Sequence, residues 1–115
     1  MAFDTLIVNA GRMKILTALA VENRQEFVHL RKSTSLTDGN LSAHARRLHA
    51  AGLIEIEKSF RDGKPVTTFA LSDEGRQRLT EHARAVMRAV DGEGRGEQTP
   101  VGVSVGGAMD EDWID

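Results

Sequence analysis

The chain has 115 residues, of which 40% are hydrophobic and 28% are charged, as is ordinary for one small globular domain. It contains no cysteine, which excludes disulfides, cysteine-ligated zinc and thiol catalysis. No stretch approaches the roughly 20 apolar residues of a membrane-spanning helix, and the first residues lack a signal-peptide pattern. We therefore expect a cytoplasmic protein with no membrane partner.

Charge is distributed unevenly along the chain. Residues 1–90 carry 14 Lys or Arg and 10 Asp or Glu, a net charge of +4, whereas residues 91–115 carry 1 and 7, a net charge of −6. A basic body is typical of a polyanion binder, although a solvated surface with a solubilising tail has the same charges. Because glycine becomes frequent and apolar periodicity ends after Val90, we expect one domain over residues 1–90 and an acidic, Gly-rich, disordered tail over residues 91–115.

The first third of the chain predicts three helical pieces. We expect a short helix near Asp4 to Val8 and a longer one from Arg12, with a break or cap at residues 9–11. A polar connection over residues 22–24 precedes a second short helix from Gln25 to about Ser33. Its candidate core residues are Phe27, Val28 and Leu30.

The stretch from Thr37 to Leu53 predicts a helix with both ends marked. Thr37 can cap the helix, Asp38 suits the positive end of its dipole, and Gly52 stands where a left-handed residue usually ends a helix. Apolar residues at i, i+4 and i+7 predict a buried stripe, formed by Leu41, Ala45 and Leu48.

A β-hairpin and a last helix follow. Residues 54–60 alternate between apolar and polar, residues 61–65 form a turn rich in charge, and residues 66–71 give the second strand. Ser72 begins a helix whose apolar spacing of four, three and four indicates a helix-pairing seam. We expect this seam to mediate dimerisation through Leu79, Ala83, Val86 and Val90.

This order of elements predicts an α+β fold, a winged helix-turn-helix with a helical core, a two-stranded wing and a C-terminal dimerisation helix. The recognition helix, residues 37–51, would enter the major groove of DNA. Steps of 100° per residue from Leu41 place Gly39, Ala43, Arg46 and Ala50 on the opposite face, with Ser42 and Arg47 on its shoulders. A solvated face with two incidental arginines is the competing interpretation.

The small residues of that face would let the helix approach the groove floor, while Arg46 and Arg47 can bind guanine or phosphate and Ser42 can bind a base edge or a phosphate. In the wing, residues 61–65, Arg61 and Lys64 suit contact with flanking DNA, unless they only solubilise the turn.

The four histidines, His29, His44, His49 and His82, have no metal-ligand spacing, and we expect neither a metal nor another cofactor. His44 lies near the buried side of its helix and suits a packing role or a phosphate contact, and His82 suits a surface position. No phosphate loop or activated nucleophile is present, so we do not expect an enzyme.

Residues 36–79, LTDGNLSAHARRLHAAGLIEIEKSFRDGKPVTTFALSDEGRQRL, together with RMKILTALA at residues 12–20, closely resemble the winged-helix regulators of the MarR-like and ArsR-like group. The resemblance covers roughly residues 3–90. It implies transcriptional regulation by a homodimer that binds double-stranded DNA. Carried over by position, it implies base-reading roles for Asp38, Gly39, Ser42, Ala43 and Arg46 and wing contacts by Arg61 and Lys64. We expect Thr37 and Arg47, which neighbour these positions on the recognition helix, to contact DNA as well.

Two functions follow as hypotheses. The first is a sequence-specific, repressor-type homodimer whose recognition helices read half-sites about 34 Å apart. The second is a winged-helix protein-interaction module without specific DNA binding. A small-molecule effector would bind most readily at the dimer interface, because one small core leaves little interior volume. Residues 110–115, DEDWID, could mimic phosphates, although a solvated terminus is the simpler expectation.

Overall fold

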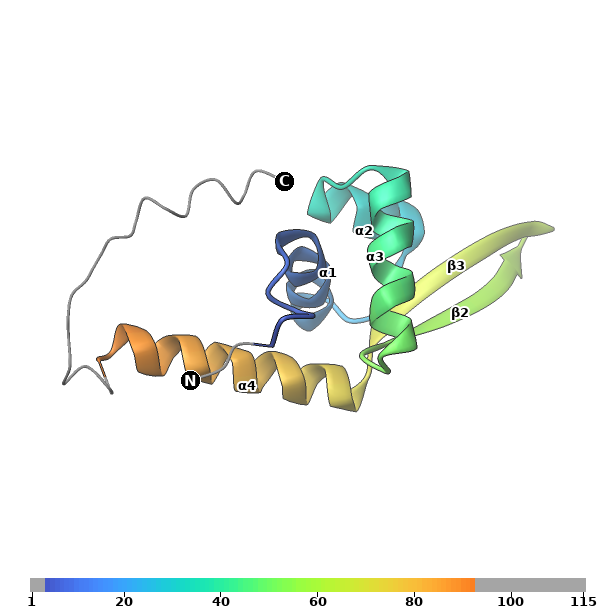
Figure 1. Cartoon of the computed structure of the whole chain (residues 1–115). Coiled ribbons are helices and arrows are strands. Elements are labelled where there is room, and N and C mark those ends of the chain that lie inside the picture. The colour runs from blue at the N-terminus through green and yellow to red at the C-terminus, as the bar shows by residue number, and fades with distance from the viewer. Residues whose placement is uncertain (1–3, 93–115) are drawn as a thin grey trace.

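The computed structural model describes residues 4–92, so the predicted tail from residue 93 onward lies outside the described residues. Within these residues, four helices and a small antiparallel sheet with strand order β1-β3-β2 build the domain (Figure 1). This arrangement confirms the α+β winged-helix prediction. The elements are α1 (Ala10–Val21), β1 (Gln25–Glu26), α2 (Phe27–Thr34), α3 (Asp38–Ala50), β2 (Ile54–Arg61), β3 (Lys64–Leu71) and α4 (Asp73–Val90).

The core lies where α1, α2 and α3 meet the base of the sheet. Ile54 and Leu71 form the first cross-strand pair of the wing, and both are buried, so the hairpin is anchored at this end. The rest of the hairpin projects away from the body, and α4 runs beneath α1 (Figure 1). The fully buried residues that hold the helices together are aliphatic: Ile7, Ile15, Leu16, Leu19, Leu30, Leu41, Leu48 and Leu53. No helix within residues 4–92 is long and apolar enough to cross a bilayer.

The predicted helix at Asp4 to Val8 is wrong, because this segment forms a single turn. The backbone carbonyl of Asp4 accepts hydrogen bonds from the Ile7 and Val8 N–H groups, and the side-chain carboxylate of Asp4 accepts one from the Leu6 N–H. Such side-chain hydrogen bonds compete with helix propagation in a segment too short to nucleate well. The same carboxylate lies 2.7 Å from Arg78 of α4, so the turn ties the N-terminal segment to the last helix. Asn9 is the cap of α1, which begins at Ala10 rather than Arg12.

The second predicted helix begins later than expected. Gln25 and Glu26 form the short strand β1, paired with Phe69 and Thr68, and α2 starts only at Phe27. The Gln25 amide is buried and donates to two backbone carbonyls at the end of α1, which holds this strand in place. Of the candidate core residues of α2, Leu30 is fully buried and Phe27 partly, whereas Val28 is 54% exposed. The prediction for Val28 is therefore wrong.

Candidate nucleic-acid interface

Both ends of α3 are fixed by the caps expected from its sequence. The Thr37 hydroxyl accepts a hydrogen bond from the Asn40 N–H at 3.1 Å, and Asp38 occupies the first turn. After the helix, Gly52 has a φ of 81° and its N–H bonds back to the carbonyl of His49. These contacts fix the ends of α3, and burial of Leu41, Ala45 and Leu48 fixes which face points outward.

The outward face of α3 carries little side-chain bulk. Gly39, Ala43 and Ala50 are exposed there, as predicted, and Arg46 is exposed beside them. A methyl group added at Gly39 would meet no atom within 4 Å, so space is open in front of this turn. At Gly39, Ala43 and Ala50 only small side chains stand between the helix backbone and solvent, so α3 can approach another surface closely at these positions.

Asp38 forms an ion pair with Arg31 of α2. Its Oδ1 lies 2.9 Å from Nε of Arg31, and its side chain stays largely exposed. The carboxylate thus interacts with a cation and with the positive end of the α3 dipole. Part of its negative charge is offset by these interactions, which link α2 to the first turn of α3.

A groove of about 390 Å³ lies between α3 and the wing. Ser42 and Arg46 line it from α3, and Lys58 and Thr67 line it from the hairpin. Neither cation has an ion-pair partner within the described residues. Sequence reasoning missed Lys58, although its alternation with Ile54 and Ile56 places it on the same face of β2. The floor of the groove is apolar, formed by Phe27, Ala45, Ile56 and Phe69.

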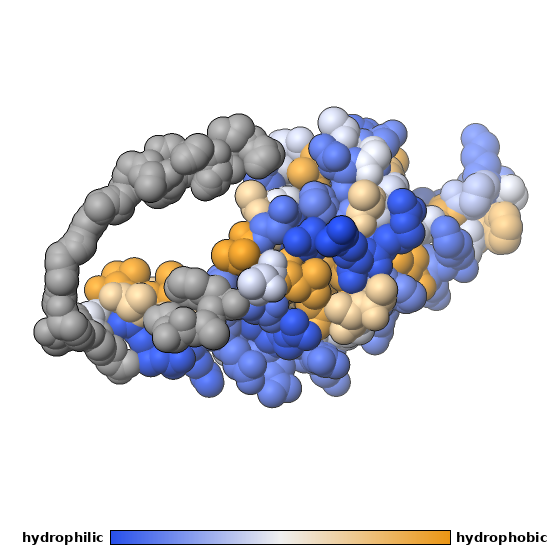
Figure 2. Space-filling model, in the orientation of Figure 1, coloured by the Kyte–Doolittle hydropathy of each residue, from blue (hydrophilic) through white to orange (hydrophobic). Residues whose placement is uncertain are grey.

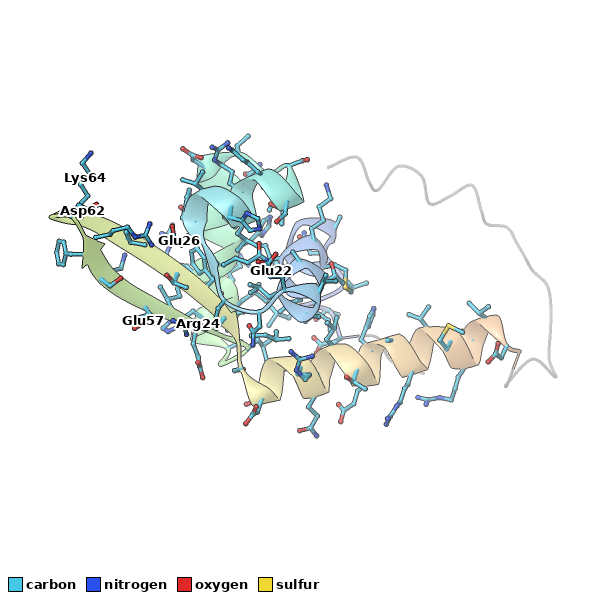
Figure 3. The ribbon with its side chains drawn as sticks, turned by 180° about the vertical axis from the view of Figure 1, so that it is seen from behind. Glu22, Arg24, Glu26, Glu57, Asp62 and Lys64 are labelled. Atoms are coloured by element: carbon cyan, nitrogen blue, oxygen red, sulfur yellow. The ribbon has the colours of Figure 1, made fainter. Side chains whose placement is uncertain are left out.

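The wing ends in a two-residue turn. Asp62 and Gly63 both have positive φ, 55° and 77°, as a tight hairpin turn with right-handed twist requires. Arg61 and Lys64, predicted to lie in the loop, are the last paired residues of the strands. Figure 3 shows Asp62 and Lys64 at the far tip. Lys64 is exposed there without an ion-pair partner within residues 4–92.

Arg61, unlike Lys64, forms an ion pair within the described residues. Its guanidinium pairs with the carboxylate of Glu26 in β1, and that hydrogen bond raises the pKa of Arg61 and lowers the pKa of Glu26. A second ion pair, between Arg24 and Glu57 at 2.6 Å, lies nearer the body (Figure 3). Both pairs brace the wing against the segment before α2. Of the two predicted wing contacts, Lys64 therefore has no ion-pair partner within residues 4–92, whereas Arg61 has one.

On its other side, α3 meets α1 through His44 and Arg12. Arg12 is only 9% exposed; its Nε donates to the Leu6 carbonyl, and its Nη1 lies 3.3 Å from His44 Nδ1. Burial lowers the pKa of His44, and the charges of Arg12 and Arg47 lower it further. The geometry confirms the packing role predicted for His44. The buried position of Arg12 was missed, because no local pattern distinguishes it from a surface arginine.

The last helix presents one face to the body and another to solvent. The Ser72 hydroxyl accepts from the Gly75 N–H at 2.9 Å, which caps α4 as predicted. His82 is buried against the body, so its predicted surface position is wrong. Within residues 4–92, no group of three or more potential metal ligands comes together.

The predicted seam of α4 is mostly exposed. Leu79 is partly buried, whereas Ala83 and Val86 are exposed. Val90 is 71% exposed, and Met87 is exposed as well. Figure 2 shows the apolar surface that gathers toward the end of α4. Beside it lies a groove of about 500 Å³ between this helix and the end of α1, lined by Ala20, Arg76, Leu79, Thr80, Ala83, Arg84, Met87, Arg88 and Asp91.

Three comparisons place the chain among known proteins. An uncharacterized protein of Methanocaldococcus jannaschii is 37% identical over 65 residues, which cover 56% of this chain and 71% of that protein. The structure of a transcriptional regulator homologue from Pyrococcus horikoshii is similar, with a TM-score of 0.73 and 27% identity over 78% of this chain and 89% of that one. A MarR-family transcriptional regulator from Silicibacter pomeroyi shares the fold, with a TM-score of 0.56 and 22% identity over 75% of this chain and 59% of that one.

The capped helix with its open outer face, the hairpin beside it and these likenesses agree with one another. A family model described as "Winged helix DNA-binding domain" matches residues 12–90, which include every element from α1 to α4 except the first two residues of α1. The chain belongs to the winged helix DNA-binding domain family, and its structural neighbours include transcriptional regulators of the MarR family.

Proposed function

We propose that this protein is a sequence-specific DNA-binding regulator of the repressor type that acts as a homodimer. The recognition helix α3 enters the major groove, and the wing lies on the flanking DNA. One observation carries the proposal: the outer face of α3 combines small residues with the exposed Arg46, and neither Arg46 nor the neighbouring Arg47 and Lys58 has a carboxylate partner within residues 4–92.

The cations stand on both sides of the open face of α3. Arg46 and Lys58 border the groove toward the wing, whereas Arg47 lies toward α1, where its charge reaches Arg12 and His44. A duplex that accepts α3 in its major groove presents a phosphate backbone on each side of the helix. Phosphate contacts would thus position the protein, and Arg46, with Ser42 beside it, would read base edges.

Dimerisation is proposed through α4. Its exposed apolar residues Ala83, Val86 and Val90 have the spacing of a helix-pairing seam, which a second helix would cover. In a two-fold dimer the two copies of α3 would read half-sites one helical turn apart, about 34 Å. Val86→Glu places a charge in this seam and should yield a folded monomer in sedimentation analysis. A stable dimer with that variant would move the interface elsewhere.

A small-molecule effector fits the groove between α1 and α4. The groove combines apolar walls at Leu79, Ala83 and Met87 with the guanidinium groups of Arg76 and Arg84, a lining that suits a small apolar acid. Since the groove shares Leu79 and Ala83 with the proposed dimer seam, we propose that an effector bound there changes the spacing of the recognition helices.

Selection of genomic fragments by the purified protein, followed by a salt titration on the best fragment, tests the proposal. We expect an enriched inverted repeat whose log affinity falls with log salt, with a slope of about −0.9 for each phosphate neutralised. If the folded dimer enriches no sequence and shows no salt-dependent affinity for duplex DNA, the protein-interaction module becomes the better assignment.

A further inference from the structure

We propose that Phe60, in the wing, inserts into the minor groove beside the recognition site as an apolar wedge between base steps. The inference rests on the proposed DNA-binding function and adds to it a residue that bends the duplex. Phe60 is 75% exposed, and its cross-strand partner is Pro65. A single exposed apolar side chain is ordinary on a protein surface, so its exposure shows only that the ring is accessible to a partner; the position of Phe60 relative to α3 and to the cations of the wing carries the proposal.

The alternation of β2 places Phe60 on the side of the wing that α3 occupies. Ile56 and Lys58 line the groove toward α3, and Phe60, two residues farther along, shares their face. Arg61 lies on the opposite face with Glu26. The wing thus directs its aromatic ring, and not its internally paired arginine, toward the side on which DNA would lie against α3.

The reach of the wing agrees with this location. Phe60 lies four residues beyond Ile56, which is at the edge of the core, and this corresponds to about 14 Å of antiparallel strand. Neighbouring major and minor grooves are separated by half a helical turn, about 17 Å. The ring of Phe60 extends beyond its backbone and can span the difference between the strand length and the groove separation.

Geometry and charge at the tip favour DNA over a protein surface. The tight turn at Asp62 and Gly63 holds Phe60 on a paired strand rather than on a loose loop. Lys58 and Lys64 lie within a few residues of the ring and lack ion-pair partners within residues 4–92, so they can bind the phosphates that border a groove. Apolar wedges between base steps, flanked by such cations, are the common means by which proteins unstack and bend DNA from the minor groove.

The test compares the full-length wild type, Phe60→Ala and Phe60→Leu on the selected operator, with the affinity and the distance between labelled duplex ends as readouts. Phe60→Ala should weaken binding about tenfold and straighten the duplex, a loss within the range of one base–aromatic contact. Phe60→Leu should retain most of both properties. Val21→Ala, at an 88% exposed apolar residue at the far end of α1, is the matched control and should change neither.

A second readout places the wedge on the DNA. Flexible pyrimidine–purine steps unstack readily and A-tracts resist it. Replacing such a step under the wing by an A-tract should weaken the wild type and leave Phe60→Ala unchanged. Unaltered affinity and bend for Phe60→Ala would overturn the wedge while leaving the proposed function standing. Loss of the dimer with Phe60→Ala would make the ring a protein contact and would also overturn it. A wild type that binds no duplex would remove both proposals.

Discussion

The carboxylate of Asp38 and the guanidinium of Arg31 form an ion pair of 2.9 Å that joins α2 to the first turn of α3. The two helices of the helix-turn-helix are therefore linked beside the surface that would meet DNA. Because both side chains are substantially exposed, the attraction is screened by solvent and by salt.

A double-mutant cycle with Arg31→Gln and Asp38→Asn measures this link. We expect a coupling free energy of unfolding of about 0.5 kcal/mol, lost at high salt, because exposed pairs rarely contribute more. Asp38→Asn should also lose its favourable interaction with the helix dipole, a further cost of about 0.5 kcal/mol. Urea unfolding at low and high salt provides the measurement, and a coupling that persists in high salt would contradict the account.

Protonation of His44 should destabilise the fold. Burial, followed by the charges of Arg12 and Arg47, holds the pKa of His44 below its ordinary value of about 6.5. The unfolded chain therefore takes up this proton more readily, so the contribution of His44 to stability is fully present above about pH 6.5 and is lost as the pH falls through the lowered pKa.

Urea unfolding between about pH 7.5 and 5.5 tests this pH dependence, above the range where carboxylates titrate. His44→Gln should have a flatter dependence of stability on pH than the wild type. His49→Gln, at an exposed position on the same helix, is the matched control and should retain the wild-type slope. An identical slope for His44→Gln and the wild type would show that another group is responsible.

Two glycines should respond in opposite ways to alanine. A methyl group at Gly75 would lie 2.0 Å from the backbone carbonyl oxygen of Leu53, and backbone cannot rotate away, so Gly75→Ala should destabilise by about 3 kcal/mol. Gly39→Ala enters open space within α3 and should stabilise by about 0.5 kcal/mol. Thermal unfolding of both variants is the measurement. If operator affinity nevertheless falls in Gly39→Ala, close approach of α3 is part of binding.

The features that could be predicted from sequence are those that depend only on residues close by in the chain. The caps at Thr37 and Ser72 and the left-handed Gly52 depend on a few neighbouring residues, and the structure confirms all three. The buried stripe of α3 was readable for the same reason, since helical spacing alone fixes its face.

Features that depend on tertiary contacts could not be predicted in this way. Val28 has the composition of a core residue but lies on the outer side of α2, and β1 exists only because β3 is available to pair with it. Arg12 contacts His44, and Lys58 lines the same groove as Ser42. In both cases the neighbour lies on another element, far away in the sequence. Helix spacing and turn chemistry contain no information about these partners.

The ion pair between Glu26 and Arg61 should limit how strongly the wing binds phosphate. Glu26→Gln removes the carboxylate that holds the guanidinium on the face away from α3, so that Arg61 can turn toward the flanking phosphates. The variant should therefore bind DNA more tightly at low salt, with a salt dependence steeper by about one counterion. Glu55→Gln, an exposed carboxylate on the same hairpin, makes the same change in net charge and serves as the control. An equal rise in both variants would indicate a general field effect and not release of Arg61.

The most direct test of the central claim is the affinity of Arg46→Ala for the selected operator and for random duplex, measured side by side. Because Arg46 stands on the outer face of α3 beside Ser42, we predict a loss of about 1–3 kcal/mol on the operator and a much smaller loss on random DNA. Lys14→Ala, which removes a positive charge from an exposed position in α1, should change both affinities equally and little. An Arg46→Ala variant with unchanged affinity for the operator would contradict the assignment of α3 as the recognition helix.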